Sequence, residues 1–195
     1  LRNLYLHREE NSGEKPVVQI DAHSDEVGFM VQAVRPNGTL QFIQLGGWVP
    51  NNIPAHKVRV QTADGNYIAG ITTSKPPHFM SREEKDHPVT LDQMSIDIGA
   101  SSREEAIEKF KIRIGMPVVP DVAFEYDEAH NLMIGKAFDC RLGCAAMIAT
   151  LRALESVSLN VDVVGAMSAQ EEVGMRGAAV TVNRVKPDIA IVFEG

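Results

Sequence analysis

The short apolar run Val161-Asp162-Val163-Val164-Gly165-Ala166-Met167 decides the fold class, because segments of helical character lie on both sides of it. Apolar and small residues recur at helical spacing over residues 142–154, and a second short helix is expected over residues 177–183. Another apolar run follows at residues 189–193. Helices that alternate with apolar strands predict an α/β fold with a mixed, largely parallel sheet and flanking helices.

Strand signals also occupy the first part of the chain. Residues 17–20 form a short apolar run, and residues 27–34 form another after a polar break. The turn at residues 35–39 contains Asn-Gly, which tolerates positive φ and favours a hairpin. We expect these first strands to share one α/β domain with the strands near the end of the chain.

The middle of the chain differs, because many short apolar runs alternate there with turn signals from residue 40 to 125. This pattern predicts an inserted β-barrel-like domain. Within it, a polar stretch at residues 75–87 predicts a loop, and Ser101 and Ser102 offer capping boxes that predict one short helix. The expected boundaries of the divided α/β domain and its insert are residues 1–39, 40–128 and 129–195.

Composition excludes several classes of protein. The formal net charge is -7, and Lys and Arg form no run, so the chain lacks the footprint of a nucleic-acid or anionic-membrane binder. No apolar stretch approaches the length of a membrane-spanning helix. Cys140 and Cys144 are the only cysteines, which is consistent with reduced thiols and predicts a cytoplasmic protein. Small or peptidic partners are favoured.

The two ends of the chain are unusual for an intact protein. It opens without Met in a strand-like alternation, and it closes directly after the apolar run at residues 189–193. Intact proteins seldom end within a buried element, so the sequence predicts a fragment of a longer protein.

The first candidate site follows the apolar run at residues 17–20. In Asp21-Ala22-His23-Ser24-Asp25-Glu26, acidic groups and an imidazole gather where a strand is expected to end. Ligands of α/β sheets bind at such ends. His23 with Asp25 two residues on suits a metal ligand whose second ring nitrogen is held by a carboxylate, although a polar surface loop would look the same.

Two further motifs place carboxylates at similar positions. Asp139 precedes an expected helix, where it could bridge two cations or simply cap the helix. Glu171 and Glu172 follow the run at residues 161–167, where one could bind metal while its neighbour takes a proton from water. An exposed acidic loop is the alternative there, and Glu194, after the last apolar run, is uninformative alone.

Taken together, these positions predict a metal site, because His and carboxylates are the ligand set of zinc, manganese or cobalt. The other histidines lie away from the acidic motifs and are expected to be solvated or structural: His7, His56, His78, His87 and His130.

With these residues in view, the chain resembles the glutamyl/deblocking aminopeptidases that form tetrahedral dodecamers, a family that also carries a cellulase-M-like label. The likeness runs over essentially the whole chain. It rests on four ordered motifs, at residues 21–29, 96–100, 135–141 and 171–174. The resemblance implies a zinc-exopeptidase-like fold, peptide substrates, two divalent metal ions, and an inserted β domain tied to oligomerisation.

The resemblance also implies a role for each candidate residue. Asp139 bridges both metals, and Glu171 is the general base. The remaining assignments are His23 and Glu172 as ligands of different metals, Asp25 as the partner of His23, and Glu194 as the next acidic ligand. The family often has a second Asp where this chain has Cys140, and its final His ligand would lie beyond residue 195.

The sequence therefore predicts a metal-dependent aminopeptidase, inactive in this truncated form. The alternatives are a metal-dependent deacylase or carboxypeptidase-like hydrolase on the same fold, an endoglucanase, and a non-enzymatic assembly subunit.

Overall fold

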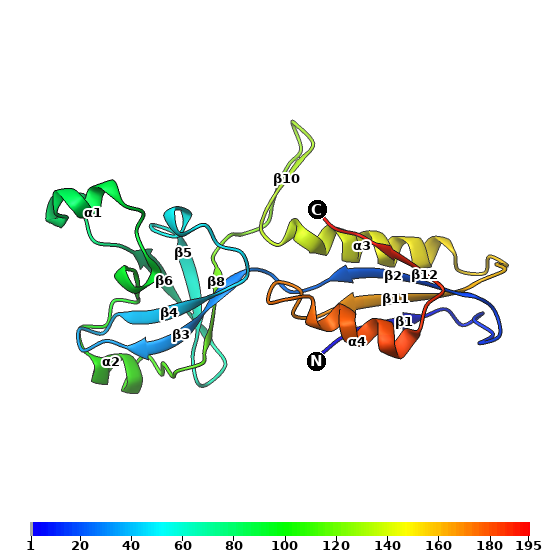
Figure 1. The fold of residues 1–195 in the computed structure, drawn as a ribbon, viewed down its shortest axis with the longest axis horizontal. Helices are drawn as coiled ribbons and strands as arrows, with labels where there is room; N and C mark the ends of the chain where they lie inside the picture. Colours follow the sequence, from blue (N-terminus) through cyan, green and yellow to red (C-terminus); the bar gives the residue numbers. More distant parts are fainter. Residues whose placement is uncertain (1) are drawn as a thin grey trace. The chain divides into compact units, whose positions relative to one another are not determined.

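The computed structural model describes residues 2–195, which fold into two compact units (Figure 1). The α/β unit contains the segment up to Glu26 and the segment from Gly135 to Gly195. The barrel unit contains Val27–Ile134. The expected boundaries were residues 39 and 129, and the difference has a physical cause. Strand β3 (Gly28–Val34) pairs with strands of the barrel and not with the strand that precedes it in sequence.

The α/β unit is built on a mixed, largely parallel sheet with the strand order β1-β11-β2-β12. The strand β2 pairs in parallel with β11 and β12, and β1 pairs antiparallel with β11. The bounds of its strands and helices are β1 Leu4–His7, β2 Val17–His23, α3 Phe138–Ala153, β11 Asp162–Ser168, α4 Arg176–Val185 and β12 Ile189–Val192.

The two faces of this sheet differ in polarity because successive side chains of β2 point to opposite faces. Ile20 packs against Met147 of α3. Gly165 lies beside Ile20 in the register, and an added Cβ there would lie 2.8 Å from the Met147 sulfur, so glycine lets α3 approach the sheet. On the other face, Gln19 donates to the buried carboxylate of Asp21. The polar face leads along β2 to His23.

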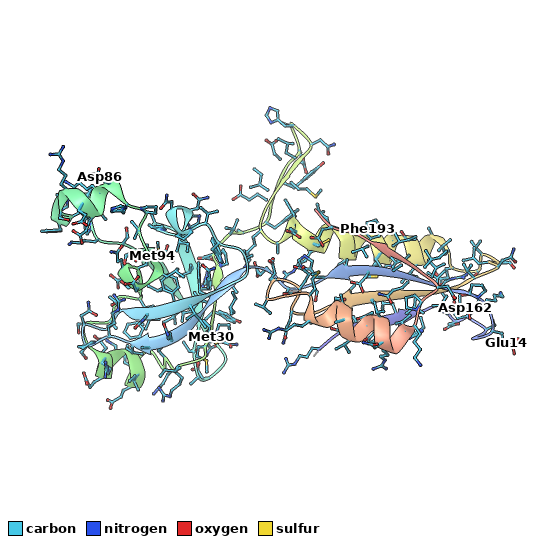
Figure 2. The ribbon with its side chains drawn as sticks, in the orientation of Figure 1. Glu14, Met30, Asp86, Met94, Asp162 and Phe193 are labelled. Atoms are coloured by element: carbon cyan, nitrogen blue, oxygen red, sulfur yellow. The ribbon has the colours of Figure 1, made fainter. Side chains whose placement is uncertain are left out.

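The barrel unit closes six strands in the order β3-β4-β7-β6-β5-β8, so each of these strands is paired on both sides. Its core is a single cluster of buried apolar side chains in which Phe29 stacks on Trp48 and meets Phe42 edge to face. Met94, labelled in Figure 2, is fully buried in the same cluster. The bounds of the other barrel strands are β4 Leu40–Leu45, β5 Lys57–Gln61, β6 Tyr67–Thr73, β7 Ser95–Asp97 and β8 Pro117–Pro120.

Short helices and a hairpin complete the barrel unit. Helix α2 (Arg103–Glu108) lies where one helix was expected, and its N-cap is Ser102, whose hydroxyl accepts from the Glu105 amide. Strands β9 (Glu125–Asp127) and β10 (Leu132–Ile134) form a separate hairpin. Three 3-10 turns have the bounds Pro50–Asn52, Pro77–Phe79 and Leu91–Gln93.

The prediction of a loop at residues 75–87 is wrong in part. Helix α1 (Arg82–Asp86) lies inside it, and Ser81 and Glu84 form a reciprocal capping box at its start. The helix contains no buried residue, so the apolar periodicity that usually reveals a helix is missing.

The last apolar run forms β12 as expected, but the strand is not buried. All its residues are exposed, because β12 pairs with β2 on one side only. None of the helices in the described part of the chain is both long and apolar enough to cross a membrane.

Candidate metal centre

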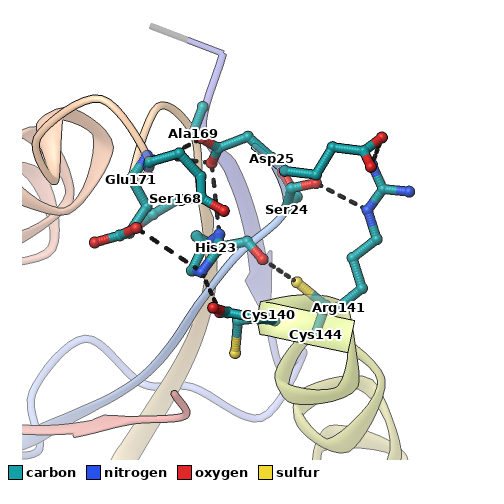
Figure 3. A network of polar contacts seen from close by, with 12 residues as sticks. His23, Ser24, Asp25, Cys140, Arg141, Cys144, Ser168, Ala169 and Glu171 are labelled. Carbon is teal, nitrogen blue, oxygen red and sulfur yellow. Dashed lines mark hydrogen bonds and ion pairs between the residues drawn. The ribbon is translucent and has the colours of Figure 1, made fainter. Parts of the chain in front are cut away.

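The candidate residues gather at one edge of the α/β sheet, where the parallel strands β2, β11 and β12 end. Figure 3 shows His23 with Asp25 and Glu171 at this edge. His23 is the last residue of β2, Glu171 follows β11 by three residues, and Glu194 follows β12 by two. Asp139 comes from the first turn of α3. Parallel strands place their carboxyl ends at the same edge, so this convergence follows from the topology.

His23 lies at the centre of this group, with a side chain that is only 2% exposed. Its Nε2 is 2.9 Å from Asp139 Oδ1, 3.6 Å from Glu194 Oε1 and 3.9 Å from Glu171 Oε2. One ring nitrogen therefore faces three carboxylates. The other, Nδ1, is buried without a hydrogen-bond partner and lies 3.7 Å from Asp25 Oδ1, beyond hydrogen-bond reach.

Asp25 fixes the segment that carries the two adjacent glutamates. Its carboxylate accepts from the backbone amides of Glu171, at 3.1 Å, and Glu172, at 3.2 Å. Gln170, just before them, has a φ of +60°, in the left-handed region, which turns the chain after β11. Gly177 lets α4 begin close to this turn, because an added Cβ would lie 2.2 Å from the carbonyl oxygen of Ala169.

Asp139 stands on an irregular stretch of backbone. Ala137, two residues before it, has a φ of +57°, and Asp139 and Cys140 have non-helical φ and ψ angles. The peptide bond between Asp139 and Cys140 is cis. The Asp139 side chain is 56% exposed, so its carboxylate faces solvent as well as His23.

The electrostatics of the group favour a cation. Burial opposes protonation of His23, but the hydrogen bond with Asp139 and the charges of the other carboxylates outweigh it and raise its pKa. Burial, supported by the neighbouring carboxylates, raises the pKa of Glu172 despite the opposing charge of His23. The direction of the His23 shift reflects the carboxylates around its ring, and a bound cation would offset their negative charge.

The residues present fit a divalent metal ion. The ligand atoms of His23, Asp139 and Cys140 lie within 4.8 Å of one another. Imidazole and carboxylate donors suit zinc, cobalt or manganese. Cys140 is a poor metal ligand, because burial raises the pKa of its thiol. The thiol instead donates a hydrogen bond to the Phe193 carbonyl. Cys140 and Cys144 are free thiols packed beside Ala22.

The structure thus brings most of the expected site residues together. His23 contacts the carboxylates of Asp139, Glu171 and Glu194, and its Nδ1 faces Asp25. Glu172 reaches the group through its backbone amide.

Sequence reasoning missed two polar contacts behind this group. The Ser168 hydroxyl donates to both oxygens of buried Asp21, and Lys136 donates to Glu26. The alternation of Gln19, Asp21 and His23 along one strand could have revealed the first contact. The second joins segments that are 110 residues apart and has no local signal.

Comparison with known proteins finds a family and relatives that are described as aminopeptidases. A family model described as M42 glutamyl aminopeptidase matches residues 3–195. The protein named “Putative aminopeptidase FrvX” of Escherichia coli (strain K12) is 38% identical over 190 residues, which cover 97% of this chain and 52% of that protein.

Two solved structures show the same architecture. The TET aminopeptidase of the marine sediment archaeon Thaumarchaeota archaeon SCGC AB-539-E09 has a TM-score of 0.92 at 36% identity, covering 98% of this chain and 54% of that one. The TET1 peptidase of Pyrococcus horikoshii, which can assemble into a tetrahedron or a large octahedral shell, has a TM-score of 0.84 at 28% identity. That match covers 98% of this chain and 56% of the other. The chain spans about half the length of the curated relatives it matches.

Proposed function

The chain belongs to the M42 glutamyl aminopeptidase family, and from this premise we propose that the intact protein is a metal-dependent aminopeptidase that hydrolyses the N-terminal peptide bond of peptides. One observation carries the proposal. The Nε2 of buried His23 faces the carboxylates of Asp139, Glu171 and Glu194 within 3.9 Å, a donor set that suits a divalent cation.

The proposed metal ligands are His23, Asp139, Glu172 and Glu194. Asp139 has two carboxylate oxygens and an exposed side chain, so it can serve two ions at once. We assign two divalent ions to the site, with zinc as the expected metal and cobalt or manganese as substitutes. Such ions would lower the pKa of the attacking water and polarise the scissile carbonyl.

Glu171 is the proposed general base. Its side chain is 28% exposed, so it remains open to water and substrate, and its backbone amide is held by Asp25. It can take a proton from the attacking water and return it to the leaving amine. Asp25 is the positioning residue in this account, because it faces His23 Nδ1 and fixes the backbone of both glutamates.

The protein is further proposed to act as a homo-oligomer in which the barrel unit supplies contacts between subunits. The assemblies formed by the TET1 peptidase of Pyrococcus horikoshii support this idea, with a dodecamer as the expected form. Light scattering of the intact protein measures the mass of the assembly directly. A monomeric mass would refute the proposed homo-oligomer.

The test of the function uses the intact protein with paired peptides that differ only in a free or acetylated N-terminus. We expect release of the first residue from the free peptide alone, loss of activity on chelation, and recovery when zinc or cobalt is added. Hydrolysis of the acetylated peptide would favour a deacylase or carboxypeptidase-like enzyme. Cleavage of a glycan with resistance to chelation would favour a glycosidase.

A further inference from the structure

The backbone around Asp139 departs from regular helical geometry. Asp139 and Cys140 interrupt the helical angles at the start of α3, and Ala137 has a φ of +57°. A non-glycine residue in this region is disfavoured and persists only when its surroundings impose it. Some contact outside the helix must therefore fix this turn.

The structure supplies such a contact on each side of Asp139. Lys136, three residues before it, donates from Nζ to Glu26 Oε1 at 3.0 Å. Arg141, two residues after it, places Nη2 3.8 Å from the same oxygen. Arg141 also donates from Nε to the Ser24 carbonyl at 3.0 Å, as Figure 3 shows.

Glu26 is the common partner of both cations, and its side chain is only 13% exposed. It lies three residues after His23, on the segment that leaves β2. The same short segment thus carries both the imidazole and the carboxylate that tethers the Asp139 turn. A change at Glu26 leaves every proposed metal ligand intact but removes the shared tether.

We propose that Glu26 is a positioning residue for the metal centre: by pairing with Lys136 and Arg141 on either side of Asp139, it holds the Asp139 carboxylate against His23. The inference rests on the proposed function, because it takes Asp139 as a ligand. The tether acts on ligand geometry, as outer contacts of metal sites do, and not on the reacting atoms.

The test is a cobalt titration of the metal-free intact protein, followed through the visible absorption of bound cobalt. Glu26→Ala should weaken cobalt binding by about 10- to 100-fold and change the shape of the absorption bands. It should lower kcat more than it changes KM. Glu26→Asp, which keeps the charge on a shorter side chain, should recover part of the affinity.

The matched control is Glu84→Ala in the barrel unit, which removes one Glu from an ion pair with Lys75 of similar length, 2.8 Å. This control should bind cobalt like the wild type. Lys136→Met removes the cation that pairs with Glu26. This variant tests the same ion pair if Glu26→Ala does not fold. In a double-mutant cycle, the effects of Glu26→Gln and Lys136→Met on cobalt affinity should not add, because both remove the same contact.

The outcomes separate the inference from the function it rests on. Cobalt affinity and spectra that stay unchanged in Glu26→Ala and Lys136→Met would overturn the inference while the proposed function stands. Additive effects in the cycle would overturn it as well, since they would mean that the two residues act separately. A wild-type protein that binds no cobalt would overturn both.

Discussion

The barrel unit and the α/β unit bury different kinds of side chain. The barrel core is one cluster of apolar residues, and its six strands leave no unpaired edge. The α/β unit has two small apolar clusters, and it contains every buried polar residue of the described chain except Thr62 and Thr72. Buried polar groups stabilise a fold only when they are well paired. Gln19, Asp21 and Ser168 form hydrogen bonds with one another on the strands that lead to His23, whereas Arg8 and Asp162 lie toward the other end of the sheet. Part of this buried polarity therefore borders the candidate site, and the barrel core has no counterpart to it.

The largest expected contrast concerns catalysis. Glu171→Gln keeps the size of the side chain but removes the proposed base, so kcat should fall by about 100- to 10,000-fold while metal stays bound. The equivalent change in the barrel unit, Glu105→Gln, should leave kcat unchanged. Steady-state kinetics and metal analysis of both variants measure this, and substantial activity in Glu171→Gln would remove Glu171 from the base role.

A second contrast concerns apolar packing. Phe29 is fully buried between Phe42 and Trp48, so Phe29→Ala should lower the free energy of unfolding by about 3–5 kcal/mol. Ile191 on β12 is 49% exposed, so Ile191→Ala should change the free energy of unfolding by less than about 0.5 kcal/mol. Trp48 is the only Trp among the 195 residues, so its fluorescence reports unfolding of the barrel during urea titration, and hydrogen exchange of β2 amides reports unfolding of the α/β unit. Equal losses for the two variants would contradict the comparison.

A third contrast concerns polar contacts. Asn3 donates to the Gly177 carbonyl and the Thr181 hydroxyl and accepts from the Ala169 amide. Asn3→Ala should therefore lower the free energy of unfolding by about 1–3 kcal/mol. Asn37→Ala in an exposed turn of the barrel unit should cost less than about 0.5 kcal/mol. Circular dichroism during thermal unfolding measures both, and a larger effect at Asn37 would reverse the expected order.

The smallest contrast is in the response to acid. Hydrogen bonds from Ser101 lower the pKa of Glu105 from 4.5 to about 2. The unfolded chain then binds the proton first as pH falls, so this contribution is complete above about pH 4.5 and is lost toward pH 2. Glu105→Gln should flatten the stability curve of the barrel unit in that window. An unchanged acid limb, followed by Trp48 fluorescence, would contradict the assignment.

The stability of the α/β unit should fall over a different pH range. Hydrogen bonds from the backbone amides of Ser12 and Gly13 lower the pKa of Asp162 below 3.8. Its contribution should therefore be present above about pH 3.8 and be lost only below it. Asp162→Asn should flatten the acid limb in the α/β unit alone, which hydrogen exchange of β11 amides can report.

Much of the site could be predicted because its signals are local. His23, Glu171 and Glu194 each follow an apolar strand closely, and parallel strands bring such positions to one edge. The strands and the two main helices of the α/β unit were visible for the same reason, since their periodicity is contained within each segment.

The missing parts depend on contacts between distant segments. The pattern of apolar residues in β3 suits either the α/β sheet or the barrel. Only the pairing of β3 with β8, about 90 residues later, assigns this strand to the barrel. The exposure of β12 depends on which strands lie beside it, which an apolar run does not specify. The hydrogen bonds from the amides of Glu171 and Glu172 to Asp25 span more than 140 residues and leave no pattern in the sequence.

We propose that the edge of the α/β sheet around His23 is a dinuclear metal centre. The most direct test is calorimetric titration of zinc into the metal-free intact protein, with Glu172→Ala and Asp139→Ala measured beside the wild type. We expect about two zinc ions per wild-type chain, one lost site in Glu172→Ala, and severe loss of both sites in Asp139→Ala. A wild-type protein that binds no zinc, or variants that bind as many ions with unchanged affinity, would contradict it.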